Sequence, residues 1–267
     1  MNGLNFLKTR KTFRRVVRLG VVALAAFLIC GMGKVATAKT LLGDFLEERD
    51  IEVTASASLD FYNKYVWRGM LLDDDCVLQP GFTISALGFE GGFWGSWDLQ
   101  NDDGLNSDEV DGWIGYSYEI EGVTLSVGHT WYDFPETDTY SKELYLGVAV
   151  DTFLSPSVTW YHDYAEEASG GADGENVVLG INHSITLNEE YGLSLDLSAE
   201  AGYNKGFFIS GVGGHYMLNA GITIPLTENL AAFPNVGYSV PLGDLEDESD
   251  GNYKEQTYAG VALALSF

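Results

Sequence analysis

Cysteine is nearly absent from this chain of 267 residues, which contains only Cys30 and Cys76. Cys30 falls in an N-terminal segment that we expect to be removed, so Cys76 alone remains in the mature chain. A single cysteine can form neither an intrachain disulfide nor a metal centre built from thiolates. The sequence therefore excludes both.

Basic residues are scarce as well, with 14 Lys and Arg against 39 Asp and Glu. Seven of the basic residues and none of the acidic ones lie in the first 38 residues, so removal of these residues leaves 7 basic against 39 acidic residues, a net charge of −32. Proteins that bind nucleic acids need positive charge to neutralise phosphates. This composition excludes a nucleic-acid partner.

The chain has one long apolar run, Leu19 to Met32, which is too short to cross a membrane comfortably as a helix. Basic residues precede it, and Ala36-Thr37-Ala38 follows as an A-x-A cleavage site. We therefore expect residues 1–38 to be a cleaved signal peptide and Lys39 to be the new N-terminus. A helical anchor that stays uncleaved is the alternative.

The mature chain shows no stretch typical of a long amphipathic or transmembrane helix, and it alternates apolar and polar residues instead. After a short periplasmic lead-in at 39–50, the alternation has the period of a β-strand whose two faces meet different surroundings. The predicted strands are 51–62, 77–88, 91–100, 109–120, 123–134, 141–150, 157–165, 175–187, 192–204, 215–227, 230–242 and 253–267.

Short and long connections alternate strictly along these strands. We place tight turns near Glu90 and at 121–122, 151–156, 188–191 and 228–229, and long loops at 63–76, 101–108, 135–140, 166–174, 205–214 and 243–252. This alternation is typical of bacterial outer-membrane barrels. The sequence thus predicts an all-β fold at 51–267, a transmembrane antiparallel up-and-down β-barrel of about 12 strands.

Aromatic residues separate this fold from a soluble barrel, whose apolar face would point inward. One group falls toward the long-loop ends of the strands, and a smaller group falls toward the short turns, as expected of belts at two membrane interfaces. The first group is Phe61, Trp97, Trp131, Trp160, Tyr203 and Tyr238; the second is Tyr116 and Phe267. Phe267 also ends an alternating strand, so we predict that it is the signal read by the barrel assembly machinery.

A family resemblance rests on the element Tyr65-Val66-Trp67-Arg68-Gly69, on the strand and hairpin from Gln79 to Trp97, and on the segments 143–147 and 157–164. In these features the chain resembles the TorF-like porins, a family of outer-membrane β-barrel proteins of unknown function. The resemblance implies an outer-membrane barrel and a porin role. It implies no particular substrate and no catalytic residues.

We interpret the protein as a small passive channel of the bacterial outer membrane that prefers cations among small solutes. If the apolar faces meet lipid, the other faces line the pore, and they carry acidic residues with no Lys or Arg deep among them. The expected pore-lining residues are Asp60, Asp98, Asp111, Glu119, Glu143, Asp163, Asp196 and Glu200. Arg68 is expected either to reach into the barrel mouth and pair with carboxylates or to remain at the membrane interface.

Two other interpretations stay open: a plugged structural or surface-binding barrel with acidic outer loops, and a barrel enzyme. Against an enzyme, the neighbours in His162-Asp163 and His183-Ser184 point to opposite faces, so neither forms a nucleophile–base pair. We expect each of the four histidines at an interface or in a loop, although the outward His183 has no evident role. No cofactor is indicated.

The acidic loop at 243–252 has the oxygen ligands that Ca²⁺ or Mg²⁺ prefers, namely Asp244, Glu246, Asp247, Glu248 and Asp250. Its spacing does not fit an EF-hand, so we favour a solvated loop and predict no metal site. These carboxylates could still share divalent cations with lipopolysaccharide phosphates.

Overall fold

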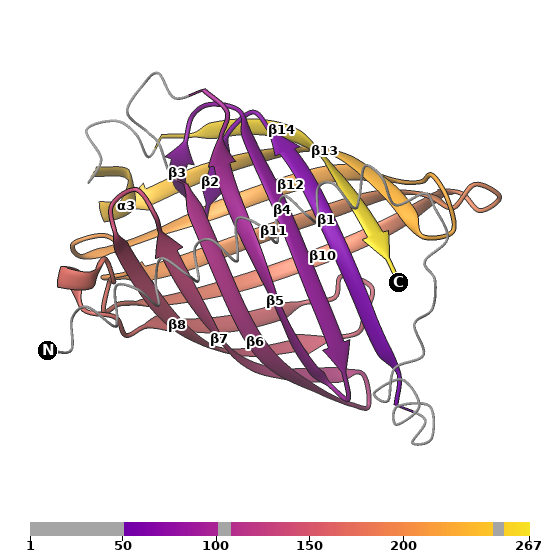
Figure 1. Ribbon diagram of the computed structural model, residues 1–267, viewed down its shortest axis with the longest axis horizontal. Helices are drawn as coiled ribbons and strands as arrows, with labels where there is room; N and C mark the ends of the chain where they lie inside the picture. Colours follow the sequence, from indigo (N-terminus) through magenta and orange to yellow (C-terminus); the bar gives the residue numbers. More distant parts are fainter. Residues whose placement is uncertain (1–50, 101–107, 248–253) are drawn as a thin grey trace, which may run out of the picture. The chain divides into compact units, whose positions relative to one another are not determined.

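The computed structural model describes residues 51–100, 108–247 and 254–267, which build a closed antiparallel barrel of twelve strands (Figure 1). β1 (Val53–Tyr62) closes the barrel by pairing with β14 (Gln256–Ser266) on one side and with β4 (Val77–Ala86) on the other. The predicted fold class is therefore confirmed. The other wall strands are β5 (Phe89–Asp98), β6 (Glu109–Ile120), β7 (Val123–Phe134), β8 (Thr139–Val150), β9 (Ser157–Asp163), β10 (Glu175–Asn188), β11 (Leu193–Lys205), β12 (Val212–Pro225) and β13 (Leu230–Gly243).

The first short turn lies earlier in the chain than its predicted position near Glu90. The chain turns at Leu87 and Gly88, whose φ angles are 55° and 83°, and β5 begins at Phe89. Positive φ at both central residues gives a two-residue turn whose twist matches that of the flanking strands. Gly88 accepts this conformation without strain because it has no Cβ. The strand that follows therefore starts earlier than its alternation suggested.

Helices are short in the described part of the chain: η1 (Glu167–Ser169) and α3 (Asp244–Asp247). Within 51–100, 108–247 and 254–267, no helix has both the length and the apolar character needed to cross a membrane. The expected signal peptide at 1–38, its cleavage after Ala38 and the lead-in at 39–50 lie outside the described residues and stay predictions.

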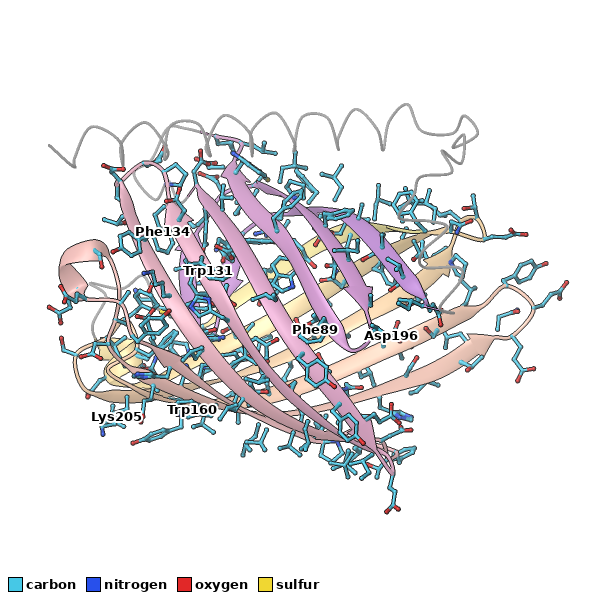
Figure 2. The ribbon with its side chains drawn as sticks, turned by 60° about the horizontal axis from the view of Figure 1, so that its bottom comes forward. Phe89, Trp131, Phe134, Trp160, Asp196 and Lys205 are labelled. Carbon is cyan, nitrogen blue, oxygen red and sulfur yellow. The ribbon has the colours of Figure 1, made fainter. Side chains whose placement is uncertain are left out.

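The two faces of the wall differ as the alternation predicted. On β8 the outward Leu144, Leu146 and Val148 are 42%, 53% and 40% exposed, whereas the inward Glu143 is 1% exposed. Large apolar side chains are also exposed on the outward face of other strands. An apolar surface of this extent is typical of a barrel that is surrounded by lipid. In Figure 2, Trp131 and Trp160 lie toward the end that carries Lys205, and Phe89 lies toward the other end.

The first long connection forms a hairpin inside the barrel, which the sequence did not predict. β2 (Tyr65–Trp67) pairs only with β3 (Met70–Asp73), outside the strand order of the wall. Arg68 and Gly69 turn the chain between them with φ angles of 47° and 84°. A Cβ at Gly69 would come within 2.5 Å of the Cβ of the inward His215 on β12, so only glycine allows the hairpin tip to lie this close to the wall.

The closed hydrogen-bond ladder should make the barrel resistant to detergent. Because no strand edge is left open, we expect unboiled protein to keep its fold in dodecyl sulfate and to migrate differently from boiled protein on a denaturing gel. The boiled sample is the unfolded control. Identical migration of the two samples, together with a freely soluble protein, would contradict a membrane barrel.

Candidate functional site

Arg68, at the tip of the β2–β3 hairpin, forms a two-pronged ion pair with Glu143 of β8. Nη1 of the arginine lies 2.6 Å from Oε2 of the glutamate, and Nη2 lies 3.2 Å from Oε1. The Tyr132 hydroxyl on β7 donates to the same carboxylate at 3.0 Å. Since Glu143 is buried, its charge would be uncompensated without these partners. The pair thus attaches the hairpin to a part of the wall far from β1.

Aromatic rings enclose the Arg68 guanidinium. Its central carbon lies 3.6 Å from the ring centroid of Tyr161, 4.4 Å from that of Trp67 and 5.2 Å from that of Phe207. Ring faces attract cations, most strongly where water is excluded. Burial by itself lowers the pKa of Arg68, but the Glu143 carboxylate more than offsets this, so the pKa lies above its ordinary value. Arg68 therefore remains charged inside the barrel.

Three segments meet in an apolar cluster beside this ion pair. Met70 of the hairpin, Ile209 of the loop after β11 and Leu245 of α3 are at most 7% exposed and pack together. Phe207 of the same loop is fully buried; its N–H donates to the Asn204 side chain at 3.0 Å, and its carbonyl accepts from that side chain at 2.9 Å. Residues 207–209 of the long loop predicted at 205–214 therefore fold inward and fill part of the bore at the long-loop end.

The hairpin is also held on its other flank. The Tyr65 hydroxyl donates to Oε2 of Glu109 on β6 at 2.9 Å, and the Tyr65 ring lies 5.4 Å from the ring of Trp94 on β5. Lys64, just before the hairpin, donates to the Gln256 side chain on β14 at 3.0 Å. Contacts from both sides therefore keep the hairpin across the bore.

All eight carboxylates expected to line the pore occupy inward positions of the strand alternation, and several are engaged. Glu143 is paired with Arg68. Asp163 is fully buried and accepts hydrogen bonds from the Ser141 hydroxyl and from the N–H groups of Ala165 and Ala172 at 3.0 and 3.1 Å. Asp163 thereby holds the loop after β9, a structural role that the sequence did not indicate.

Asp196 and Glu200, both on β11, have partners as well. Asp196 accepts from the hydroxyls of Ser184 at 2.6 Å and Thr223 at 2.5 Å. Atom Oε1 of Glu200 lies 3.2 Å from Nε2 of His215. Both acidic side chains are therefore oriented by their neighbours on the wall.

The other four expected carboxylates form no ion pair with a described residue; Asp98 accepts the N–H of Gln100 at 2.7 Å, and Asp111 lies beside Glu109 on the same strand. Asp60, Asp98 and Asp111 each have one buried carboxyl oxygen without a hydrogen-bond partner in the described protein. Glu119, near the short-turn end of β6, is exposed. Of these four side chains, Glu119 alone is exposed, whereas the unpartnered oxygens of the three aspartates are out of contact with the open bore.

The histidines separate into two groups. His129, His162 and His183 face outward, and His183 is explained by the turn after β8, where its Nδ1 lies 2.7 Å from the carbonyl oxygen of Phe153 and its ring packs on that of Phe153. His215 contradicts the expectation of an interface or loop position, because it is 1% exposed and points inward under the hairpin tip. The alternation of inward and outward residues along β12 is by itself enough to predict that His215 faces inward.

The acidic, histidine and cysteine side chains of the described residues form no metal centre. Among them, no three His, Cys, Asp or Glu side chains come close enough together to hold a metal ion. In the acidic loop, Asp244 accepts the N–H of Val212 at 2.7 Å and begins α3. Glu248 and Asp250 lie outside the described residues.

Sequence reasoning missed the neutral residues of the lumen. Tyr62, Asn219, Asn235 and Tyr258 lie on inward positions of β1, β12, β13 and β14 and are linked in pairs by hydrogen bonds. The period-two alternation placed each of them inward. They carry no charge and match no catalytic pattern, so no further signal in the sequence marks them.

The barrel is closed and antiparallel, and it has an apolar outer face and a polar bore that an inward hairpin narrows. These features define a porin-like β-barrel. The chain belongs to a family described as "Bacterial protein of unknown function (Gcw_chp)", whose model matches residues 47–239. This agrees with the predicted membership of a family without known function, while the narrower name TorF-like stays an expectation.

Solved structures of similar fold include porins. The KdgM porin has 11% sequence identity and a TM-score of 0.53, with 80% of this chain and 99% of that chain covered. The NanC porin has 7% identity and a TM-score of 0.51, with 78% and 98% covered. A further structure is the KdgM porin in complex with disordered oligogalacturonate, with 12% identity and a TM-score of 0.52. No curated protein sequence matches the chain. At these identities, the likeness concerns the fold.

Proposed function

We propose that the protein is a passive channel of the bacterial outer membrane, exported by way of its signal peptide, that passes small solutes and prefers cations. The observation that carries the proposal is the pairing of an exposed apolar outer face with a bore lined by polar and acidic side chains. An outer surface of this kind is stable in lipid, and a polar interior is stable in contact with water. Porins among the proteins of similar fold support the same function.

The preference for cations follows from the sign of the charges in the bore. Among the described inward residues, Arg68 compensates Glu143, while Asp60, Asp98 and Glu119 have no cationic partner. In a narrow space with walls of low dielectric constant, uncompensated negative charge concentrates cations and repels anions. The KdgM porin has been captured with oligogalacturonate, an acidic saccharide, and a bore of negative charge would disfavour such a solute here.

Partners follow from this location. The outward apolar face would contact membrane lipid, the acidic outer loops would meet lipopolysaccharide through shared divalent cations, and the barrel assembly machinery would insert the chain. These partners are inferred from the fold and from the charge of the chain.

A plugged structural or surface-binding barrel is the second candidate, and the inward hairpin favours it. The cluster of Met70, Ile209 and Leu245 forms a small core across part of the bore. A conductance measurement in planar bilayers separates the two candidates, because a plugged barrel would carry no current. A barrel enzyme has no comparable support, since no Ser, Thr or Cys side chain is hydrogen-bonded to a histidine among the described residues; His129 contacts the Tyr164 hydroxyl on the outward face.

Ion selectivity tests the charge argument. The double variant Asp60→Asn with Glu119→Gln should lower the preference for K⁺ over Cl⁻, because it removes two inward charges that have no cationic partner. The reversal potential across a salt gradient measures this. Glu121→Gln, in the turn after β6, removes an acidic charge outside the bore and should leave the selectivity unchanged. A wild-type channel that selects anions would overturn the proposed preference.

A further inference from the structure

Inward aromatic rings on one side of the bore lie flat against the wall. Tyr62 on β1 stands opposite Gly260 on β14, and a Cβ at that glycine would come within 2.3 Å of the tyrosine ring. Tyr258 stands opposite Gly237 on β13, where a Cβ would come within 2.1 Å of its ring. The rings occupy the space that a side chain would need. One face of the Tyr62 ring therefore covers the glycine and the other is left toward the lumen, whereas Tyr258 is 8% exposed and is largely covered by its neighbours.

Packing of an aromatic ring on a cross-strand glycine also occurs elsewhere in the wall, as with Tyr145 over Gly128, and by itself it serves the sheet. The first two rings differ because amide side chains accompany them. Asn235 donates to the Tyr62 hydroxyl at 2.9 Å, and the Tyr258 hydroxyl donates to Asn219 at 2.7 Å. Asn235 also donates to the Phe233 carbonyl at 3.0 Å, so the groups left without a partner among the described residues are the Asn235 side-chain oxygen and the Asn219 N–H₂.

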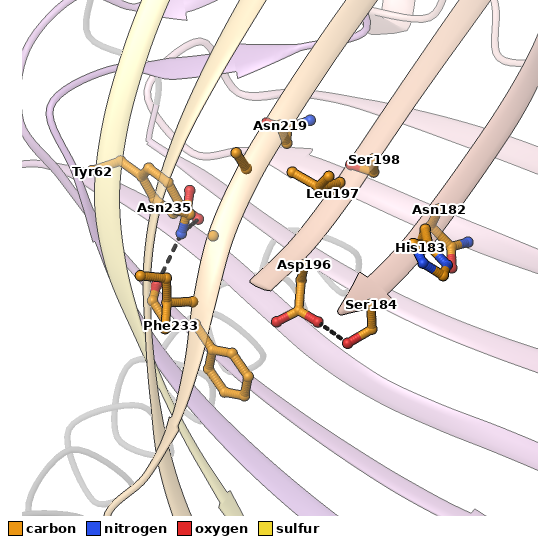
Figure 3. A pocket seen from close by; sticks show the side chains of 13 residues that line it. Tyr62, Asn182, His183, Ser184, Asp196, Leu197, Ser198, Asn219, Phe233 and Asn235 are labelled. Carbon is orange, nitrogen blue, oxygen red and sulfur yellow. Dashed lines mark hydrogen bonds between the residues drawn. The ribbon is translucent and has the colours of Figure 1, made fainter. Parts of the chain in front are cut away.

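Two cavities adjoin these four residues. One of about 370 Å³ is lined by Tyr62, Asn219, Asn235, Phe233, Ser198 and Asp196, among others (Figure 3). A second of about 220 Å³ lies beside the hairpin, shares Tyr62, Asn219 and Asn235 with the first, and adds Tyr258, Gln79 and Lys64. The shared residues place the cavities next to each other along the bore. The larger one is within the size range of small-molecule sites, which begins at roughly 300 Å³.

Neutral side chains dominate this surface. In the two cavities the charged lining residues are Lys64, beside the hairpin, and Asp196, whose carboxylate is occupied by Ser184 and Thr223. Between them stand phenol rings, primary amides and the Ser198 hydroxyl. Primary amides both donate and accept hydrogen bonds, and ring faces attract polarised C–H groups. The arrangement therefore fits a solute that has hydroxyl groups at its edge and C–H groups on its face.

We propose that Tyr62, Tyr258, Asn219 and Asn235 form a binding track for neutral carbohydrate within the bore. This inference rests on the proposed channel function and names a class of solute for it. A sugar ring would pack its C–H face on Tyr62, its hydroxyls would pair with the two amides, and the buried Tyr258 would orient Asn219. Along the track, Lys64 is the one cationic side chain that could pair with an acidic saccharide, and the acidic side chains of the bore would repel such a solute. Neutral sugars are therefore the favoured class.

Maltotriose tests the proposal on the full-length mature protein in planar bilayers. Added at millimolar concentration, it should reduce the ion current reversibly and saturably. A polyethylene glycol of similar length and the acidic trimer of galacturonate should reduce the current less at equal concentration. Equal block by maltotriose and polyethylene glycol would show obstruction by size alone and would overturn the proposal.

Variants locate the track. Tyr62→Ala should weaken the block by maltotriose roughly tenfold, because it removes both the ring face and a hydrogen-bonding hydroxyl. Tyr62→Phe keeps the ring and should weaken it less, which separates lost binding from lost folding. Tyr145→Ala, a ring on glycine in another part of the wall, is the matched control and should leave the block unchanged. An equal loss in Tyr62→Ala and Tyr145→Ala would contradict a track at these residues.

Failure of the channel proposal can be told apart from failure of this one. A correctly folded barrel that carries no current would overturn the channel function. Titration calorimetry of maltotriose into the detergent-solubilised protein then tests the site directly, with Tyr62→Ala as the comparison. Saturable heat that is lost in Tyr62→Ala would support the site, and its absence in the wild type would overturn it.

Discussion

Replacing Glu143 with glutamine should raise the single-channel conductance several-fold. The Glu143 carboxylate accepts two hydrogen bonds from Arg68 and one from Tyr132 while it is 1% exposed. Glutamine leaves one acceptor oxygen and turns an amide N–H₂ toward the guanidinium, so the Arg68 charge becomes buried without a counter-ion. Removal of one partner from a buried pair costs about 3–5 kcal/mol. The hairpin should then leave the bore for much of the time.

Two comparisons make this result specific. Asp196→Asn also removes an inward negative charge, but Asp196 does not contact the hairpin, so its conductance should stay near that of the wild type. The double variant Arg68→Gln with Glu143→Gln replaces the buried charges by two amides that can bond to each other, and its conductance should fall back toward the wild-type value. Unchanged conductance in a Glu143→Gln protein that still shows the gel shift would mean that the ion pair does not hold the hairpin.

Deletion of Phe267 should remove most of the assembled barrel from the outer membrane. The Phe267 N–H donates to the Ala55 carbonyl at 2.9 Å, across the β1–β14 seam that closes the barrel. Its side chain is 50% exposed at the short-turn end, where an aromatic ring is stabilised at a membrane interface. Its loss therefore removes a seam contact and an interface anchor, together with the expected recognition signal.

The measurement is the fraction of protein in isolated outer membranes that shows the gel shift on boiling. Ala264→Ser, at an inward position of the same strand, alters neither the seam ladder nor the interface and should assemble normally. Normal assembly of the protein without Phe267 would refute the predicted role of this residue.

The wall of the barrel was predictable from the sequence because strand periodicity is a local property. In β8, Leu144, Leu146 and Val148 face one way and Glu143 the other, and adjacent residues suffice to show it. The alternation of short and long connections then fixed an up-and-down order of twelve strands. Local turn geometry shifted strand ends by a few residues, as Gly88 did for β5.

The sequence by itself thus determined the twelve strands of the wall and the inward or outward face of their side chains. Only the tertiary structure decided what fills that bore, because the contacts there join residues far apart in the chain. Arg68 and Glu143 are separated by 75 positions, and Tyr258 and Asn219 by 39. Whether a loop folds inward depends on the space left by the closed wall, as at Gly69 against His215, and no local pattern records that space.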